Sequence, residues 1–450
     1  MSQIIIKKDN SSTNRFPRLT YALGLGNYIG SVLFDNLYQF LAIMLGATGI
    51  IQGFLTSFRQ LGAALFNPLW GYLADKFDRR IFLFGGNLIL FLVSFLIPYS
   101  PNPLTVLILL IFQTILGLVV VGPAWSAYLS DFTTPKSRGT ALGQISSIIT
   151  FIGNIVLLAV TFILDLFDPT RQNIQTLTLP FFISSFGYGF AMFLTIFLPK
   201  SQKTLTQEFL KPKRRRELKE FVFQIPTPLK KFFIADFIFT LAWGAGWPLF
   251  PYVTFDLCDN WFEIGVLAFS MGITVAISQN VGGWLTDKIG RKKVILGSRG
   301  ALILPPIFII LAILTNQVSW ILITNIIIGF FLGGSTIAIQ TLIFDISEMT
   351  LENSNSKATY ISLAGLISGI SAFIGSSITG LVLQILSGTH QPSLQLIGVL
   401  MFIVFLSRFL LWFSYFIIED PSEFQKSSVS NTIFTISNFI RSKFNLFPRK

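Results

Sequence analysis

Gly71-Tyr-Leu-Ala-Asp75-Lys-Phe-Asp78-Arg79-Arg80 decides the fold, because a closely related stretch returns as Gly283-Trp-Leu-Thr-Asp287-Lys-Ile-Gly290-Arg291-Lys292. Each stretch follows a long apolar run and is followed at once by another, which predicts a short polar turn between two membrane helices. The offset of 212 residues is nearly half of the 450-residue chain. A same-sense repeat of this size predicts two membrane halves related by an axis along the membrane normal.

The composition agrees with a membrane protein. The chain is 52% hydrophobic and 12% charged, and its mean hydropathy is +0.68, which does not suit a water-soluble surface. We predict an all-α membrane protein with twelve transmembrane helices in two pseudo-symmetric six-helix bundles. The first apolar segment, about twenty residues from Tyr21, lacks a small-residue cleavage site, so we expect an uncleaved first span.

Positive charge is concentrated on one side of the predicted membrane. With twelve spans drawn, 29 of the 33 Lys and Arg residues fall in the arms and loops of that side. The positive-inside rule makes this side, with both chain termini, cytoplasmic. The net charge of +12 therefore predicts contact with a bilayer whose inner leaflet is anionic, and no nucleic-acid partner.

Five parts are predicted along the chain. They are a cytoplasmic N-terminal arm (1–18), an N-terminal six-helix bundle (19–198), a cytoplasmic basic linker (199–231), a C-terminal six-helix bundle (232–418) and a cytoplasmic amphipathic tail (419–450). The linker holds 10 basic and 3 acidic residues, a composition that favours contact with anionic headgroups. The tail mixes apolar and basic residues, as an interfacial helix does. We expect a monomer.

The repeated loop resembles the signature of the major facilitator superfamily, which lies between the second and third helices of each half. The resemblance implies a secondary transporter whose two halves rock about a central cavity. The loops would hold the halves together on the cytoplasmic side, with Asp75 accepting hydrogen bonds from a helix N-terminus and an arginine. The alternative is a polar turn that only sets orientation. The predicted cytoplasmic gate consists of Gly71, Asp75, Arg79, Arg80, Asp131, Arg138, Gly283, Asp287, Gly290, Arg291, Lys292 and Asp345.

One position of the two loops differs in its backbone demands. Gly290 suits a turn with positive φ. Asp78 stands where the superfamily has this glycine. Since Asp tolerates the left-handed region better than most residues, we expect the turn to survive there.

An acid and a base are predicted inside the membrane at similar depth. At 1.5 Å rise per residue, Asp35 and Arg59 each lie about 13 Å below the outer ends of their helices (19–44 and 50–74). Each costs at least ~2.5 kcal/mol in hydrocarbon, so we predict that they pair or share one cavity. Asp35 would be the titrating carboxylate, biased by Arg59. The alternative is an interfacial acid and a structural cation.

Gln113 departs from the superfamily pattern. Proton-coupled members often have an arginine at this place, and Arg59 on the neighbouring helix would supply the missing cation. The predicted helix 140–164 also lacks the Gly-Pro pair of many drug/proton antiporters. Of the two remaining arginines inside predicted helices, Arg299 is expected to reach the cytoplasmic headgroups and Arg408 to be structural.

The predicted helix 232–255 breaks its own regularity in Trp243-Gly-Ala-Gly-Trp247-Pro-Leu-Phe-Pro251-Tyr252. Prolines and glycines here remove helix hydrogen bonds, and such broken segments commonly border the solute path. The alternative is an aromatic belt near the outer interface, chiefly for Tyr252. The predicted solute-cavity residues are Asn36, Tyr38, Gln39, Gln113, Trp125, Trp243, Trp247, Tyr252, Gln279 and Gln340.

These features predict a secondary active transporter of a small organic solute in the cell membrane, with the proton as coupling ion. The chain has no Gly-Lys dipeptide and hence no phosphate-binding P-loop. The aromatic and amide cavity residues favour export of amphipathic compounds. The alternatives are uptake of a sugar or organic anion by symport, and a solute receptor of the same fold that does not transport. With one His and neither His-Glu-x-x-His nor Gly-x-Ser-x-Gly, we predict no enzyme, catalytic residue, metal site or cofactor.

Overall fold

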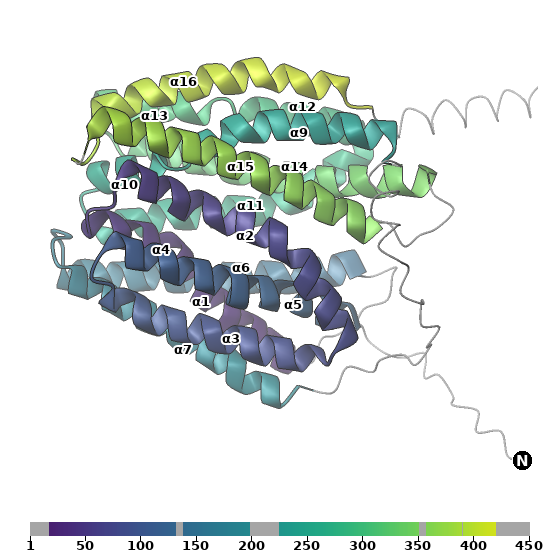
Figure 1. Ribbon diagram of the computed structural model, residues 1–450, viewed down its shortest axis with the longest axis horizontal. Helices are drawn as coiled ribbons and strands as arrows, with labels where there is room; N and C mark the ends of the chain where they lie inside the picture. Colours follow the sequence, from purple (N-terminus) through teal and green to yellow (C-terminus); the bar gives the residue numbers. More distant parts are fainter. Residues whose placement is uncertain (1–17, 132–137, 199–224, 351–356, 389, 420–450) are drawn as a thin grey trace, which may run out of the picture.

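A computed structural model of the chain describes residues 18–131, 138–198, 225–350, 357–388 and 390–419. The predicted N-terminal arm, most of the basic linker and the amphipathic tail lie outside these ranges. The described residues form helices and no strand, which confirms the all-α class. Figure 1 shows the long helices running side by side in two groups, the first half of the chain below the second.

The first group contains the helices before residue 198. They are α1 (Arg18–Met44), α2 (Gly49–Lys76), α3 (Arg79–Leu96) with η1 (Ile97–Tyr99), α4 (Pro103–Phe112), the π-helical turn η2 (Gln113–Leu118), α5 (Val119–Asp131), α6 (Arg138–Phe167), η3 (Ile174–Leu177) and α7 (Thr178–Ile196). Because η2 continues α4 directly into α5, these three elements make one rod.

The second group contains the helices after residue 225. They are α9 (Thr227–Ala245), α10 (Phe250–Leu257), α11 (Trp261–Ile289), α12 (Arg291–Ala301), α13 (Pro305–Thr315), α14 (Ser319–Thr350), α15 (Lys357–Ser387), α16 (Leu394–Trp412) and η5 (Phe413–Ile417). Ten spans in the described part of the chain are long and apolar enough to cross a membrane. α1 and α2, with 27 and 28 residues, are equally long but more polar.

The turns between helices define the two ends of the molecule. We call the end with residues 76–79 and 289–291 the signature end, and the end with residues 45–48, 168–173 and 258–260 the far end. In Figure 1 the far end lies at the left. Since the helices alternate in direction, both signature loops lie at the same end, as the duplication predicts.

Two long helix pairs form most of the contact between the halves, α2 with α15 and α6 with α11. The first pair is close because glycines meet backbone at its far end. A Cβ added at Gly380 would lie 2.7 Å from the carbonyl oxygen of Gly49 and 3.0 Å from Cα of Gly53. Beside them, the hydroxyls of Thr56 and Ser376 are 2.7 Å apart. Small residues permit this backbone approach between membrane helices.

Prolines interrupt two rods of the second half. Pro248 and Pro251 lack the N–H groups that would continue the helix between α9 and α10. The sequence predicts this break. A second break separates α12 from α13 before Pro305 and Pro306, and no sequence prediction covered it. Both breaks free backbone carbonyl groups inside the second bundle.

The two signature loops turn by different means. Gly290 has a φ of +97°, which confirms the predicted positive-φ turn. Asp78 keeps a φ of −65° and caps α3 by accepting a hydrogen bond from the Arg80 amide (3.1 Å). The turn therefore survives through a helix cap, without the left-handed backbone. Arg80 also pairs with the Asp78 carboxylate (2.7 Å).

One predicted gate pair is described in the second half. The Nε atom of Arg291 lies 2.7 Å from a carboxylate oxygen of Asp345, which ties the start of α12 to α14. Lys292 donates to the carbonyl of Phe416 (3.1 Å), within the same half. The side chains of Asp75, Asp131, Arg138 and Asp287 and the surroundings of Gly71 lie outside the described residues.

A buried ion pair holds the second bundle together near the signature end. Arg299 on α12 contacts Asp236 on α9 at 3.2 Å, and the Tyr415 hydroxyl donates to the same carboxylate (2.9 Å). Arg299 is 8% exposed and Asp236 4%. The expectation that Arg299 reaches the headgroups is wrong, because the guanidinium has a carboxylate partner inside the bundle.

Replacing Arg299 by Met should therefore destabilise the protein strongly. The Asp236 carboxylate would remain buried without its cation, which typically costs about 3–5 kcal/mol. Thermal unfolding of the purified protein in detergent measures the loss. The double variant Asp236→Asn, Arg299→Met should recover most of the stability, because no unpaired charge is left. A single variant as stable as the wild type would contradict this account.

Candidate functional site

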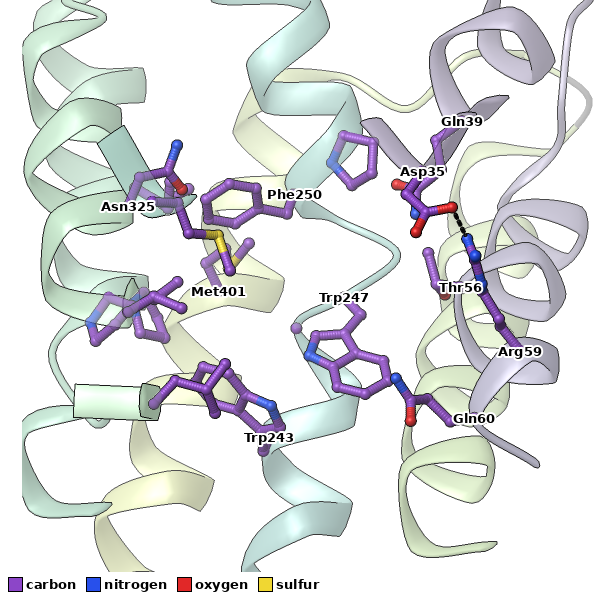
Figure 2. Close-up of a pocket in the computed structure, with 18 of the residues that line it drawn as sticks. Asp35, Gln39, Thr56, Arg59, Gln60, Trp243, Trp247, Phe250, Asn325 and Met401 are labelled. Carbon is purple, nitrogen blue, oxygen red and sulfur yellow. Dashed lines mark ion pairs between the residues drawn. The ribbon is translucent and has the colours of Figure 1, made fainter. Parts of the chain in front are cut away.

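A cavity of about 440 Å³ lies between the two halves. Its first wall comes from α1 and α2, and its second from α9 to α11, α13, α14 and α16. Figure 2 shows the two walls facing each other across the open space. The lining residues are Asp35, Tyr38, Gln39, Thr56, Arg59, Gln60, Trp243, Gly246, Trp247, Phe250, Pro251, Met271, Pro305, Pro306, Ile309, Asn325, Ile328, Leu332, Met401 and Arg408.

Asp35 and Arg59 form an ion pair on the first wall, drawn as a dashed line in Figure 2. This confirms the predicted pairing. The Ser31 hydroxyl donates to the second Asp35 oxygen at 2.8 Å, and the Arg59 guanidinium lies 6.0 Å from the Tyr38 ring centroid. The Asp35 side chain is 35% exposed and that of Arg59 14%. A group in the cavity can therefore reach the carboxylate more easily than the guanidinium.

The second wall is mainly aromatic and apolar. The break between α9 and α10 turns Trp243, Trp247 and Phe250 toward the cavity, and Met271 and Met401 extend the apolar surface. Figure 2 shows the Trp247 indole pointing into the space between the walls. Flat aromatic rings and flexible thioethers suit apolar solutes of different shapes.

Arg408 adds a positive charge to this wall. Its guanidinium donates to the carbonyls of Ala242 (3.4 Å), Trp243 (3.0 Å) and Leu302 (3.2 Å). The Leu302 carbonyl is free because Pro306, four residues later, has no N–H. Arg408 also lies 4.4 Å from the Trp243 ring centroid. The predicted structural role is thus supported, since Arg408 joins two broken rods, yet the same side chain lines the cavity.

The far end of the cavity is sealed by contacts between the halves. The Tyr252 hydroxyl donates to the Ala47 carbonyl (2.8 Å), and Arg171 donates to the Phe255 carbonyl (2.6 Å). The rings of Phe40 and Phe255 stack with centroids 6.1 Å apart. An apolar cluster from both halves fills the space around these contacts. The described conformation is therefore closed at the far end.

Cys258, the single cysteine of the chain, belongs to this seal and is 0% exposed. Burial raises the pKa of its thiol to about 12. Because the thiolate is the reactive form, maleimide should label the folded protein at neutral pH at least ~100-fold more slowly than the unfolded chain. The labelling rate should rise with pH toward this pKa. Mass spectrometry measures it, and equal rates for folded and unfolded protein would refute the buried position.

Four predicted cavity residues line this cavity, namely Tyr38, Gln39, Trp243 and Trp247. Three other predicted cavity residues do not line the cavity and lie within the first half or at the far end. Asn36 donates to the carbonyl of Val32 (2.7 Å) on its own helix, and Gln113 is fully buried in the π-helical turn. Tyr252 belongs to the far-end seal. These three corrections share a cause, since helix phase and not residue type decides which side chain faces the cavity.

The remaining three predicted residues also lie away from the cavity. Trp125 lines a separate space of about 310 Å³ within the first half. Gln279 and Gln340 are exposed and are absent from the lining. Sequence reasoning missed Thr56, Gln60, Asn325 and the position of Arg408 in the cavity lining. The adjacent prolines at 305 and 306 were the available signal for a second broken rod at this depth.

The fold and the cavity define a multi-pass integral membrane protein with a solute-sized space between two helical bundles. Residues 20–348 and 232–446 match the Major Facilitator Superfamily, and the chain belongs to this family. It is a transporter of the cell membrane and not an enzyme.

Known relatives and structures agree with this assignment. The chain is 25% identical over 290 residues to the multi-drug resistance efflux pump PmrA of Streptococcus pneumoniae, covering 60% of this chain and 67% of the pump. It is 25% identical over 337 residues to the multidrug resistance protein MdtG of Citrobacter koseri, covering 71% of this chain and 78% of that protein.

Two solved structures share the fold. A mutant of the nucleoside transporter NupG superposes with a TM-score of 0.71 at 13% identity, covering 89% of this chain and 99% of NupG. The inward-open xylose transporter XylE of E. coli gives 0.61 at 14% identity, covering 89% and 95%. These likenesses concern the fold alone.

Proposed function

We propose that this transporter moves a small amphipathic organic solute by alternating access and couples the movement to protons. The observation that carries the proposal is the Asp35–Arg59 ion pair on the wall of a cavity shared by both halves. Ionisable residues inside a membrane are rare, and they mark substrate pathways, ion pathways or proton relays. The apolar second wall would bind the body of the solute.

The coupling step is a change of charge at Asp35. When the carboxylate takes up a proton it loses its attraction to Arg59, and the hydrogen bond from Ser31 weakens. The net charge of the cavity rises by one. The affinity of the cavity for a charged solute therefore depends on whether Asp35 is protonated. This dependence links solute binding to proton binding.

The proposed orientation places the signature end in the cytoplasm, on the distribution of Lys and Arg. The described conformation is then closed to the outside, and the two halves must part at the far end during transport. The signature loops would act as the gate of the signature end, and they would close this end when the far end opens. We also propose the five parts that the sequence predicts, namely arm, first bundle, linker, second bundle and tail, which end at residues 18, 198, 231, 418 and 450.

Export is the first candidate for the direction, because the similar proteins PmrA and MdtG are named for drug efflux and multidrug resistance. Uptake of an organic anion with a proton is the second candidate. Arg408 favours it, since this cation lines the cavity beside an aromatic surface.

Purified protein in liposomes tests the proposal. An imposed pH gradient should drive the flux of at least one labelled compound from a panel of amphipathic drugs, sugars and organic anions. The sign of the flux relative to the proton gradient distinguishes exchange from symport. Solute binding without any flux, in either direction and with any gradient, would favour a receptor and would reject the proposal.

A further inference from the structure

We infer that Arg408 is a binding site for an anionic group, so that the solute is an amphipathic organic anion such as an aromatic carboxylate. This inference rests on the proposed transport function and deepens it. Arg408 lines the cavity although its side chain is almost completely buried, with 4% exposed. A charged group in this position faces the solute from inside the protein wall.

The charge of Arg408 has no balancing carboxylate among the described residues. The described ion pairs bring Asp35 to Arg59, Asp236 to Arg299 and Asp345 to Arg291. Arg408 has only the carbonyl groups of two broken rods, which carry partial charges. An arginine inside a membrane is costly, and an arriving anion would supply the missing charge.

Its hydrogen-bonding capacity points the same way. A guanidinium has five N–H groups in a planar fork, and three of them donate to the carbonyls of Ala242, Trp243 and Leu302. The carbonyls and the Trp243 ring fix the guanidinium in one place. No described residue accepts a hydrogen bond from the other two N–H groups, and two is the number that a carboxylate accepts in a bidentate contact.

The neighbouring surface fits the rest of such a molecule. Trp247, Phe250 and Met401 line the cavity together with Arg408, so an anionic head and an aromatic body can be bound at once. The charged residues of the cavity lining are Asp35, Arg59 and Arg408. Since Asp35 balances Arg59, the charge of Arg408 leaves an excess of one positive charge. A cationic amphipathic compound would meet repulsion in this space.

The excess charge also predicts how proton and solute are linked. Protonation of Asp35 removes a negative charge from the cavity and thereby strengthens the attraction for an anion. Proton and anion therefore favour each other's binding, and the linkage is reciprocal. Such positive linkage belongs to symport, so an anionic solute favours the second candidate over export by exchange.

Equilibrium binding of a matched probe series tests the inference. Naphthylacetate, naphthylethanol and naphthylethylamine share one aromatic body and differ in charge. Isothermal calorimetry on the wild type in detergent should give at least about tenfold tighter binding of the anion than of the neutral alcohol. The amine should bind weakest. Asp35→Asn, which is uncharged like the protonated acid, should tighten the binding of naphthylacetate.

Variants then assign the selectivity to Arg408. Arg408→Gln should lose the preference for naphthylacetate and keep the affinity for naphthylethanol, whereas Arg408→Lys should retain most of the preference. Lys293→Gln removes an exposed positive charge outside the cavity and is the matched control. Equal affinity of the wild type for the anion and the alcohol overturns the inference, even if Arg408→Gln does not fold.

Binding and flux separate this inference from the proposed function. Selective binding of naphthylacetate without proton-driven flux would support the anion site and reject proton-coupled transport of this probe class. Proton-driven flux of neutral compounds without anion selectivity would support the transport proposal and overturn the anion site.

Discussion

Asp35→Asn should reduce solute flux driven by a pH gradient more than about tenfold, because an amide cannot carry the proton that couples the two movements. Exchange of labelled for unlabelled solute, with no gradient, should continue. Asn keeps the size of Asp and can still accept the hydrogen bond from Ser31, so the cavity should keep its shape. Flux in liposomes with and without a pH gradient measures the two activities.

The exposed acid Asp259 provides the control. Asp259→Asn removes a carboxylate from the far-end turn, outside the cavity, and should leave both activities unchanged. Retained pH-driven flux in Asp35→Asn would remove Asp35 from the coupling mechanism. Loss of exchange as well would indicate that the carboxylate is needed for solute binding or for the structure of α1.

Gly380→Ala should disfavour the sealed state of the far end. The new methyl would lie 2.7 Å from the carbonyl oxygen of Gly49, so α2 and α15 must separate. Overpacking of this kind costs about 1–3 kcal/mol, and a cost of about 2 kcal/mol shifts the ratio of sealed to open protein roughly thirtyfold. We expect a matching loss of transport and faster maleimide labelling of Cys258.

Gly365→Ala is the matched control on the same helix, because the added methyl would meet no atom within 4 Å beyond its chain neighbours and the backbone of its own helix. It should transport and label like the wild type. Normal transport by Gly380→Ala would show that close packing of α2 and α15 is dispensable. Slow transport with unchanged Cys258 labelling would point to a general loss of stability, which thermal unfolding would detect.

The sequence predicted the features that depend on composition and on the repeat. The two signature loops, the pair of Asp35 and Arg59 and the break before Pro248 follow from hydropathy, rise per residue and missing N–H groups. Each of these signals is local to one helix or is repeated along the chain. They were sufficient for the fold class and for part of each cavity wall.

The rest of the cavity required the phase of each helix, which residue type does not reveal. Gln113 looked like a cavity residue, yet the π-helical turn buries it. Arg299 and Arg408 look alike in sequence, as arginines in apolar runs. In the structure Arg299 meets Asp236, 63 positions away, and Arg408 meets the freed carbonyl of Leu302, 106 positions away. Such long-range partners depend on the packing of several helices.

The central claim is that the two halves open in turn at the two ends of a shared cavity. Spin labels on a Cys258→Ser background test it by pulsed electron resonance, with one pair at exposed positions Gln175 and Gln317 of the far end and one at Phe77 and Lys293 of the signature end. Acidification together with a transported solute should lengthen the first distance and shorten the second. Two distances that stay constant, or that change in the same direction, would contradict the claim.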